Sequence, residues 1–72
     1  MEYQLPESKA EIKLLKAQDV AEILNVSRSL AYALMQQGEL RTVRIRGSVR
    51  VRPEDLRDFI KDNLSLGLEE YQ

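Results

Sequence analysis

Residues 20–40 read VAEILNVSRSLAYALMQQGEL, and this stretch decides the fold class of the chain. Before Asn25, apolar side chains recur every three or four residues, which predicts a short amphipathic helix over about 17–24. Ser27 is a residue type that caps helix N-termini, and Gly38 readily adopts the left-handed conformation that ends a helix. A second short helix is therefore predicted between Ser27 and Gly38.

Two helices joined by about three residues, the second closed by glycine, match the helix-turn-helix outline. One face of the second helix is apolar and is expected to be buried; it comprises Leu30, Ala31, Leu34 and Met35. The opposite face has no acid and carries side-chain types that contact base edges and phosphates: Arg28, Ser29, Tyr32, Ala33 and Gln36. A capping and packing role for Arg28, Ser29 and Tyr32 is the alternative.

Residues 43–51 read VRIRGSVRV and alternate β-branched residues with arginine, which predicts a half-buried β-hairpin. A two-residue loop at Gly47–Ser48 would mix apolar and charged side chains on each face. We therefore predict a three-residue loop over 46–48, or a bulge, with Arg46 at the tip. With this loop, the apolar residues that face inward pair across the two strands, Val43 with Val51 and Ile45 with Val49.

Pro53 predicts the first position of a third helix, because its missing N–H costs nothing there. This helix is expected to end near Asn63 and to bury Leu56, Phe59 and Ile60. The fold class is α+β: a small winged helix-turn-helix, with three short helices and a two-stranded β-hairpin wing between the second and third. We expect a flexible arm over 1–12, the domain over 13–63 and a C-terminal tail over 64–72.

Charge is unevenly distributed along the chain. The formal net charge is -1, yet the segment from Ser27 to Arg52 holds six arginines against one acid, Glu39, a local charge of +5. Such a segment in an acidic chain indicates a polyanionic partner. Arginines on the outer side of the hairpin repel one another unless their charge is neutralised. Phosphates can neutralise it, and so can acids of the third helix such as Glu54, Asp55 and Asp58. Both kinds of pairing can coexist.

Composition excludes several classes of function. The chain has no cysteine and no histidine, so thiolate metal sites, disulfides and the commonest general base are missing. We therefore expect neither an enzyme nor a cofactor or metal site. Apolar runs fall short of the roughly 20 residues that span a bilayer. The start MEYQLPESK is too polar for a secretory signal, so a cytoplasmic, nucleoid-associated protein is expected.

The blocks 20–40 and 43–60 resemble the excisionase-type, or small MerR-like, winged helix-turn-helix family, and the resemblance covers roughly 14–60. Lys16 stands where that family often has threonine and Val49 where it often has an aromatic residue; neither touches the binding face. The resemblance implies a second helix in the major groove and a wing on the adjacent backbone or minor groove. It assigns DNA binding to Ser27, Arg28, Ser29, Tyr32, Arg44, Arg46 and Arg50. The expected site also includes Ala33, Gln36, Arg41 and Ser48.

Proteins of this type act architecturally, so the resemblance implies sequence-specific duplex DNA binding by an excisionase, or recombination directionality factor, that acts with an integrase. A small prokaryotic transcriptional regulator needs the same contacts and remains open. A protein-interaction module that binds an acidic partner is a third alternative. Fewer than ten residues follow Asn63, too few for the long dimerisation helix of full MerR-type regulators. We expect a monomer in solution that binds DNA head to tail.

Overall fold

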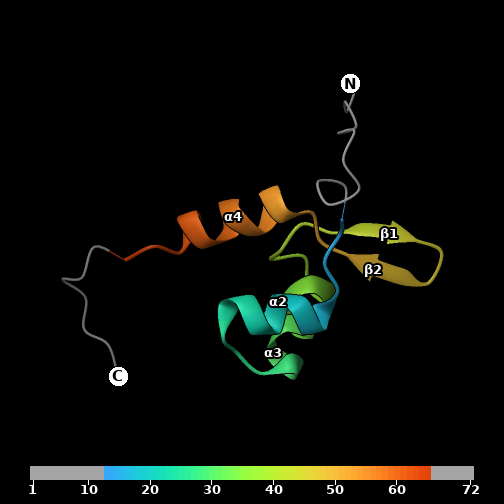
Figure 1. The fold of residues 1–72 in the computed structure, drawn as a ribbon, viewed down its shortest axis with the longest axis horizontal. Coiled ribbons are helices and arrows are strands. Elements are labelled where there is room, and N and C mark those ends of the chain that lie inside the picture. The colour runs from blue at the N-terminus through green and yellow to red at the C-terminus, as the bar shows by residue number, and fades with distance from the viewer. Residues whose placement is uncertain (1–12, 66–72) are drawn as a thin grey trace.

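The computed structural model describes residues 13–65 and confirms the predicted α+β winged helix-turn-helix architecture. Within these residues the elements are α2 (Ala17–Leu24), α3 (Arg28–Gln36), β1 (Val43–Ile45), β2 (Ser48–Arg50) and α4 (Pro53–Asp62). Figure 1 shows the β1–β2 hairpin, here called the wing, projecting at the opposite end of the molecule from the last turn of α4. The predicted arm over 1–12, and the predicted tail from residue 66 onward, lie outside the described residues.

α2 begins without a side-chain acceptor at its N-cap, because that residue is Lys16. The carboxylate of Asp19 supplies the other half of a capping arrangement: it accepts a hydrogen bond from the backbone N–H of Lys16 at 2.9 Å. Its negative charge also complements the helix dipole in the first turn. α2 ends at Asn25, whose φ of 59° is left-handed, a conformation that asparagine tolerates better than most residues.

The boundaries of α3 are those that the sequence predicts. The Ser27 hydroxyl caps the helix by accepting a hydrogen bond from the backbone N–H of Leu30 at 3.0 Å. At the other end, Gly38 adopts a φ of 80°, which glycine reaches without steric cost. The next two backbone N–H groups then donate to the carbonyl of Leu34. These bonds satisfy groups that the helix end would otherwise leave unpaired.

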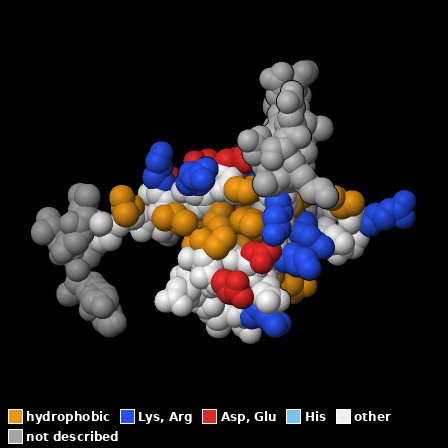
Figure 2. Space-filling model, viewed as in Figure 1, with side chains coloured by type: hydrophobic (Ala, Val, Ile, Leu, Met, Phe, Trp, Pro, Cys, Tyr) orange, Lys and Arg blue, Asp and Glu red, His pale blue; other side chains and the backbone are white. Residues whose placement is uncertain are grey.

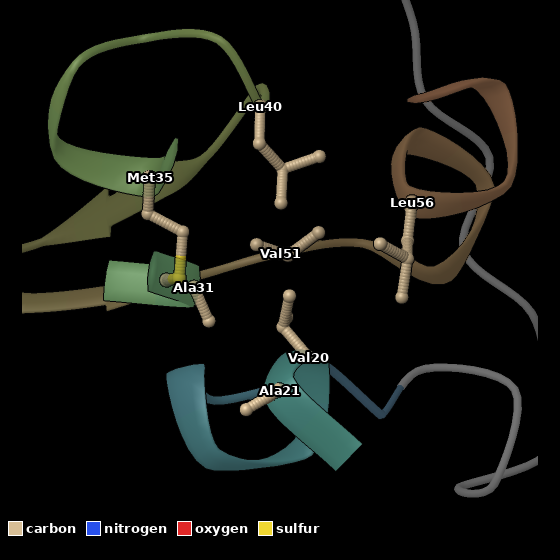
Figure 3. Close-up of a cluster of buried hydrophobic side chains, with 7 residues drawn as sticks. All are labelled: Val20, Ala21, Ala31, Met35, Leu40, Val51 and Leu56. Carbon is tan, nitrogen blue, oxygen red and sulfur yellow. The ribbon is translucent and has the colours of Figure 1, made fainter. Parts of the chain in front are cut away.

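The hydrophobic core is small and centres on Val51, as Figure 3 shows. Val51 is fully buried, and its backbone exchanges two hydrogen bonds with Leu15, at 2.8 and 2.9 Å. The apolar stretch before α2 therefore holds the base of the wing against the helices. The buried apolar side chains of the described residues are Val20, Ala21, Ala31, Met35, Leu40, Val51 and Leu56.

Two helical residues predicted to be buried are exposed instead. Leu30 is 46% exposed, because α3 packs mainly against α2 and other side chains fill that contact. These are Ala31 and Met35. Ile60 is 42% exposed and lines an open apolar groove of about 210 Å³ between α2 and α4. Figure 2 shows this groove as part of an apolar band between the two helices.

The hairpin loop differs from the prediction. Ile45 pairs with Ser48 and Arg44 with Val49, so the loop has two residues, Arg46 and Gly47, rather than three. Arg46 makes this tight turn possible by adopting a φ of 57°, which non-glycine residues rarely do. Arg46 still lies at the tip, as predicted.

The new register redistributes side chains over the two faces of the wing. Directly opposed residues of an antiparallel pair share a face, so Arg44 lies on the face of Val49, which packs against the core. Ile45 lies on the other face with Arg50 and is 54% exposed, although it was predicted to point inward. Only the base of this short ribbon touches the core, so burial does not enforce the alternation near its tip.

Candidate nucleic-acid interface

The face of α3 that the sequence predicted to carry the contact residues is largely exposed to solvent. Arg28, Ser29 and Gln36 are exposed, Tyr32 is 55% exposed, and Ala33 is half-buried. No acidic residue occurs between Ser27 and Gly38, so nothing within α3 offsets the charge of Arg28. The face offers a guanidinium, a hydroxyl, a phenol and an amide at once, a set suited to base edges and phosphates.

A shallow depression of about 420 Å³ joins this face to the start of α2. Its lining comprises Lys16, Ala17, Gln18, Arg28, Ser29 and Tyr32. Two cationic side chains of this lining, Lys16 and Arg28, suit an anion, whereas the N-terminus of α2 already carries the carboxylate of Asp19. Sequence reasoning missed Lys16 and Gln18 as candidate contacts. The signal available was their position at the N-terminus of the first helix of a two-helix motif.

The wing carries a second group of basic side chains. Arg44, Arg46 and Ser48 are exposed, and Arg50 is half-buried, with Nη1 donating to the backbone carbonyl of Val49 at 3.0 Å. Arg44 and Arg50 lie on opposite faces of the ribbon, whereas the sequence prediction placed both on its outer side. Figure 2 shows Lys and Arg side chains gathered at this end of the molecule.

Acidic residues of α4 pair with the arginines at the base of the wing. The buried carboxylate of Asp55 accepts two hydrogen bonds from Arg52, from Nε at 2.6 Å and from Nη2 at 2.9 Å. Glu54 lies 3.5 Å from Arg52 Nη1, and Arg41 Nη1 lies 4.0 Å from Asp55. Among the described residues, the predicted pairing of hairpin arginines with α4 is thus found for Arg52 alone, and Arg41, for which no pairing was predicted, also approaches Asp55.

The other four arginines of the basic segment have no acidic partner within the described part of the chain. Across residues 13–65, no carboxylate oxygen lies within 4.0 Å of the guanidinium groups of Arg28, Arg44, Arg46 and Arg50. Arg28 lines the depression, and Arg44, Arg46 and Arg50 lie on the wing. Positive charge concentrated in this way raises the local concentration of a polyanion.

A family model described as a helix-turn-helix domain matches residues 14–64. The chain belongs to this helix-turn-helix family. No curated protein and no solved structure gives a match. Membership of a helix-turn-helix family indicates DNA binding, and it agrees with the electrostatics of the exposed α3 face.

The helix-turn-helix unit of this chain is α2, the turn over 25–27, and α3. The wing and α4 complete the domain and lie within the matched segment. Across residues 13–65, no helix is both long enough and apolar enough to cross a membrane.

Proposed function

We propose that the chain binds duplex DNA sequence-specifically, with α3 in the major groove and the wing along the adjacent backbone or minor groove. The observation that carries this proposal is the division of the basic segment: two arginines brace the fold through Asp55, and four have no acidic partner among residues 13–65. Unpaired arginines repel one another, and phosphate oxygens are the acceptors that match their planar forks.

The exposed face of α3 supplies base recognition in this proposal. Arg28 has the bidentate geometry that reads guanine, and Gln36 has the amide that reads adenine. In this proposal the exposed Ser29 and Tyr32 contact phosphates or bases, and the half-buried Ala33 offers a methyl group for the methyl of thymine. Ser27 contributes through its cap, which orders the first turn of α3.

Phosphate contacts fix the register of the protein on the duplex. The depression between α2 and α3 receives one phosphate, which the ammonium group of Lys16 binds. Arg44, Arg46, Ser48 and Arg50 follow the backbone beside the neighbouring groove. Arg41 is 77% exposed and 4.0 Å from Asp55, so it reaches a phosphate while remaining near its acid.

Within this activity we propose an architectural role, that of an excisionase which acts with the integrase of a mobile element and binds side by side on repeated sites. The sequence resemblance over 14–60 and the projecting wing support it. Deletion of the gene in its host is expected to stop excision of the element and to leave integration intact. Unchanged excision with altered transcript levels would instead support a small transcriptional regulator.

Substitution Arg28→Ala is expected to weaken binding to a preferred duplex by about 1 to 3 kcal/mol and to affect random duplex much less. The reason is that Arg28 reads a base edge rather than the uniform backbone. Fluorescence anisotropy with a duplex selected from a random pool, and with an unselected one, measures both affinities. Arg57→Ala, on the exposed side of α4, is the matched control and should change neither. Equal losses on both duplexes for Arg28→Ala would contradict base reading.

A further inference from the structure

Ile45 occupies an unusual place for an exposed apolar side chain. It forms the outermost pair of the wing with Ser48, directly before the two-residue loop, and is 54% exposed. Arg44 and Arg46 flank it in sequence, and Arg50 shares its face of the ribbon. An isoleucine therefore stands at the tip of the most basic part of the molecule.

The fold does not account for this side chain. Ile45 is absent from the hydrophobic core and from the partly buried residues that pack against it, whereas Val49 and Val51 hold the wing to the helices. Ile23 and Ile60, which are also exposed, line the apolar groove between α2 and α4. A single exposed isoleucine is ordinary on a protein surface, but this one lies where the proposed partner is a polyanion.

We propose that Ile45 is a wedge that enters the minor groove and partly unstacks one base-pair step, so that the duplex bends away from the wing. This inference rests on the proposed DNA binding and names a further contact residue for it. Proteins that enter the minor groove use apolar side chains in this way, and the kinks that result range over about 20–90°.

The tip of the wing has the shape that such an insertion needs. Gly47 carries no side chain, and the space that one would fill is open, so the backbone of the loop can approach the groove closely. Ser48, opposite Ile45, is small. Arg46 projects at the turn, where the negative potential of a narrow minor groove attracts a guanidinium.

A wedge also selects sequence without hydrogen bonds to bases. Pyrimidine–purine steps unstack more readily than other steps, so the duplex preferred by this protein is expected to carry one where the wing meets the minor groove. Replacing that step by a stiff A-tract should then weaken binding although α3 meets unchanged bases.

The bend is measured by energy transfer between dyes at the two ends of a selected duplex, with full-length protein at saturating concentration. Wild type is expected to bend the duplex, and Ile45→Ala to reduce the bend by about 20° or more. Ile45→Thr, which keeps a β-branched strand residue but adds a hydroxyl, should lose the bend as well. Ile23→Ala is the matched control, because Ile23 is also 54% exposed but lies on α2, and it should leave the bend unchanged.

Two outcomes overturn the wedge and leave DNA binding intact: a wild-type complex with a straight duplex, or an Ile45→Ala complex as bent as wild type. The salt dependence of affinity provides a separate check, because Ile45→Ala removes no charge and should keep the wild-type slope. Failure of the wild-type protein to bind any duplex would instead refute the proposed function itself.

Discussion

Reversing both exposed arginines near the tip of the wing, Arg44→Glu with Arg46→Glu, is expected to weaken binding to every duplex by at least about 100-fold at low salt. Each arginine that meets a phosphate contributes about 1.5–3 kcal/mol as a charge-assisted hydrogen bond, and 1.4 kcal/mol corresponds to a tenfold change. The new carboxylates add repulsion. Neither arginine has an acidic partner among residues 13–65, so no ion pair within the described fold is lost.

The matched control for the wing reversal is Arg57→Glu with Lys61→Glu. Both residues are exposed on α4, and the substitution changes net charge by the same amount at a surface outside the proposed interface. Fluorescence anisotropy on random duplex separates a local contact from a general charge effect. Equal losses of affinity for the two double variants would contradict a DNA contact at the wing.

Placing a carboxylate in the core with Val51→Asp is expected to leave the domain unfolded at room temperature. Val51 is 0% exposed and lies at the centre of the buried cluster, where Leu15, the helices and the wing meet. An unpaired buried carboxylate costs several kcal/mol, and about 1.5 kcal/mol of apolar burial is lost with the valine. Domains of this size have a free energy of unfolding of only about 4–11 kcal/mol.

Far-UV circular dichroism and urea titration measure the effect of Val51→Asp on folding. The control is Leu64→Asp, which introduces the same charge beyond the end of α4 at a site that is 72% exposed and should change the free energy of unfolding by less than about 0.5 kcal/mol. A cooperative urea transition for Val51→Asp near that of wild type would show that Val51 does not anchor the wing to the helices.

Most helix boundaries could be predicted from sequence because their signals are local. The Ser27 hydroxyl, the left-handed Gly38 and the ring of Pro53 each act within one turn of the helix they cap or begin. Burial on α3 was harder to predict, since Leu30 belongs to the apolar face of a helical wheel but neither joins the core nor packs against it.

The hairpin loop and the faces of the wing could not be predicted from sequence. The loop prediction assumed that every apolar residue of the ribbon faces inward and that a two-residue loop would begin at glycine. In the structure Arg46 takes the left-handed position instead. The exposure of Ile45 follows from how little of the wing the core covers, which depends on tertiary packing.

One part of the candidate interface could likewise be predicted from sequence, and another part could not. The exposed residues of α3 were evident from the pattern of one helix. Lys16 and Gln18 were not, because their proximity to Arg28 requires the packing of α2 against α3. The double hydrogen bond between Arg52 and Asp55 likewise needs the turn into α4, and only that geometry shows which arginines stay available to a ligand.

The salt dependence of binding to random duplex tests the proposed interface most directly. Lys16 at the depression and the wing arginines Arg44, Arg46 and Arg50, each neutralising one phosphate, predict that log affinity falls against log salt concentration with a slope of about -3.6. Arg41 is not counted, because Asp55 lies 4.0 Å from its guanidinium group. The measurement is an anisotropy titration of wild-type protein at several salt concentrations. No binding even at the lowest salt, or binding whose affinity does not change with salt, would contradict a DNA interface built on these arginines.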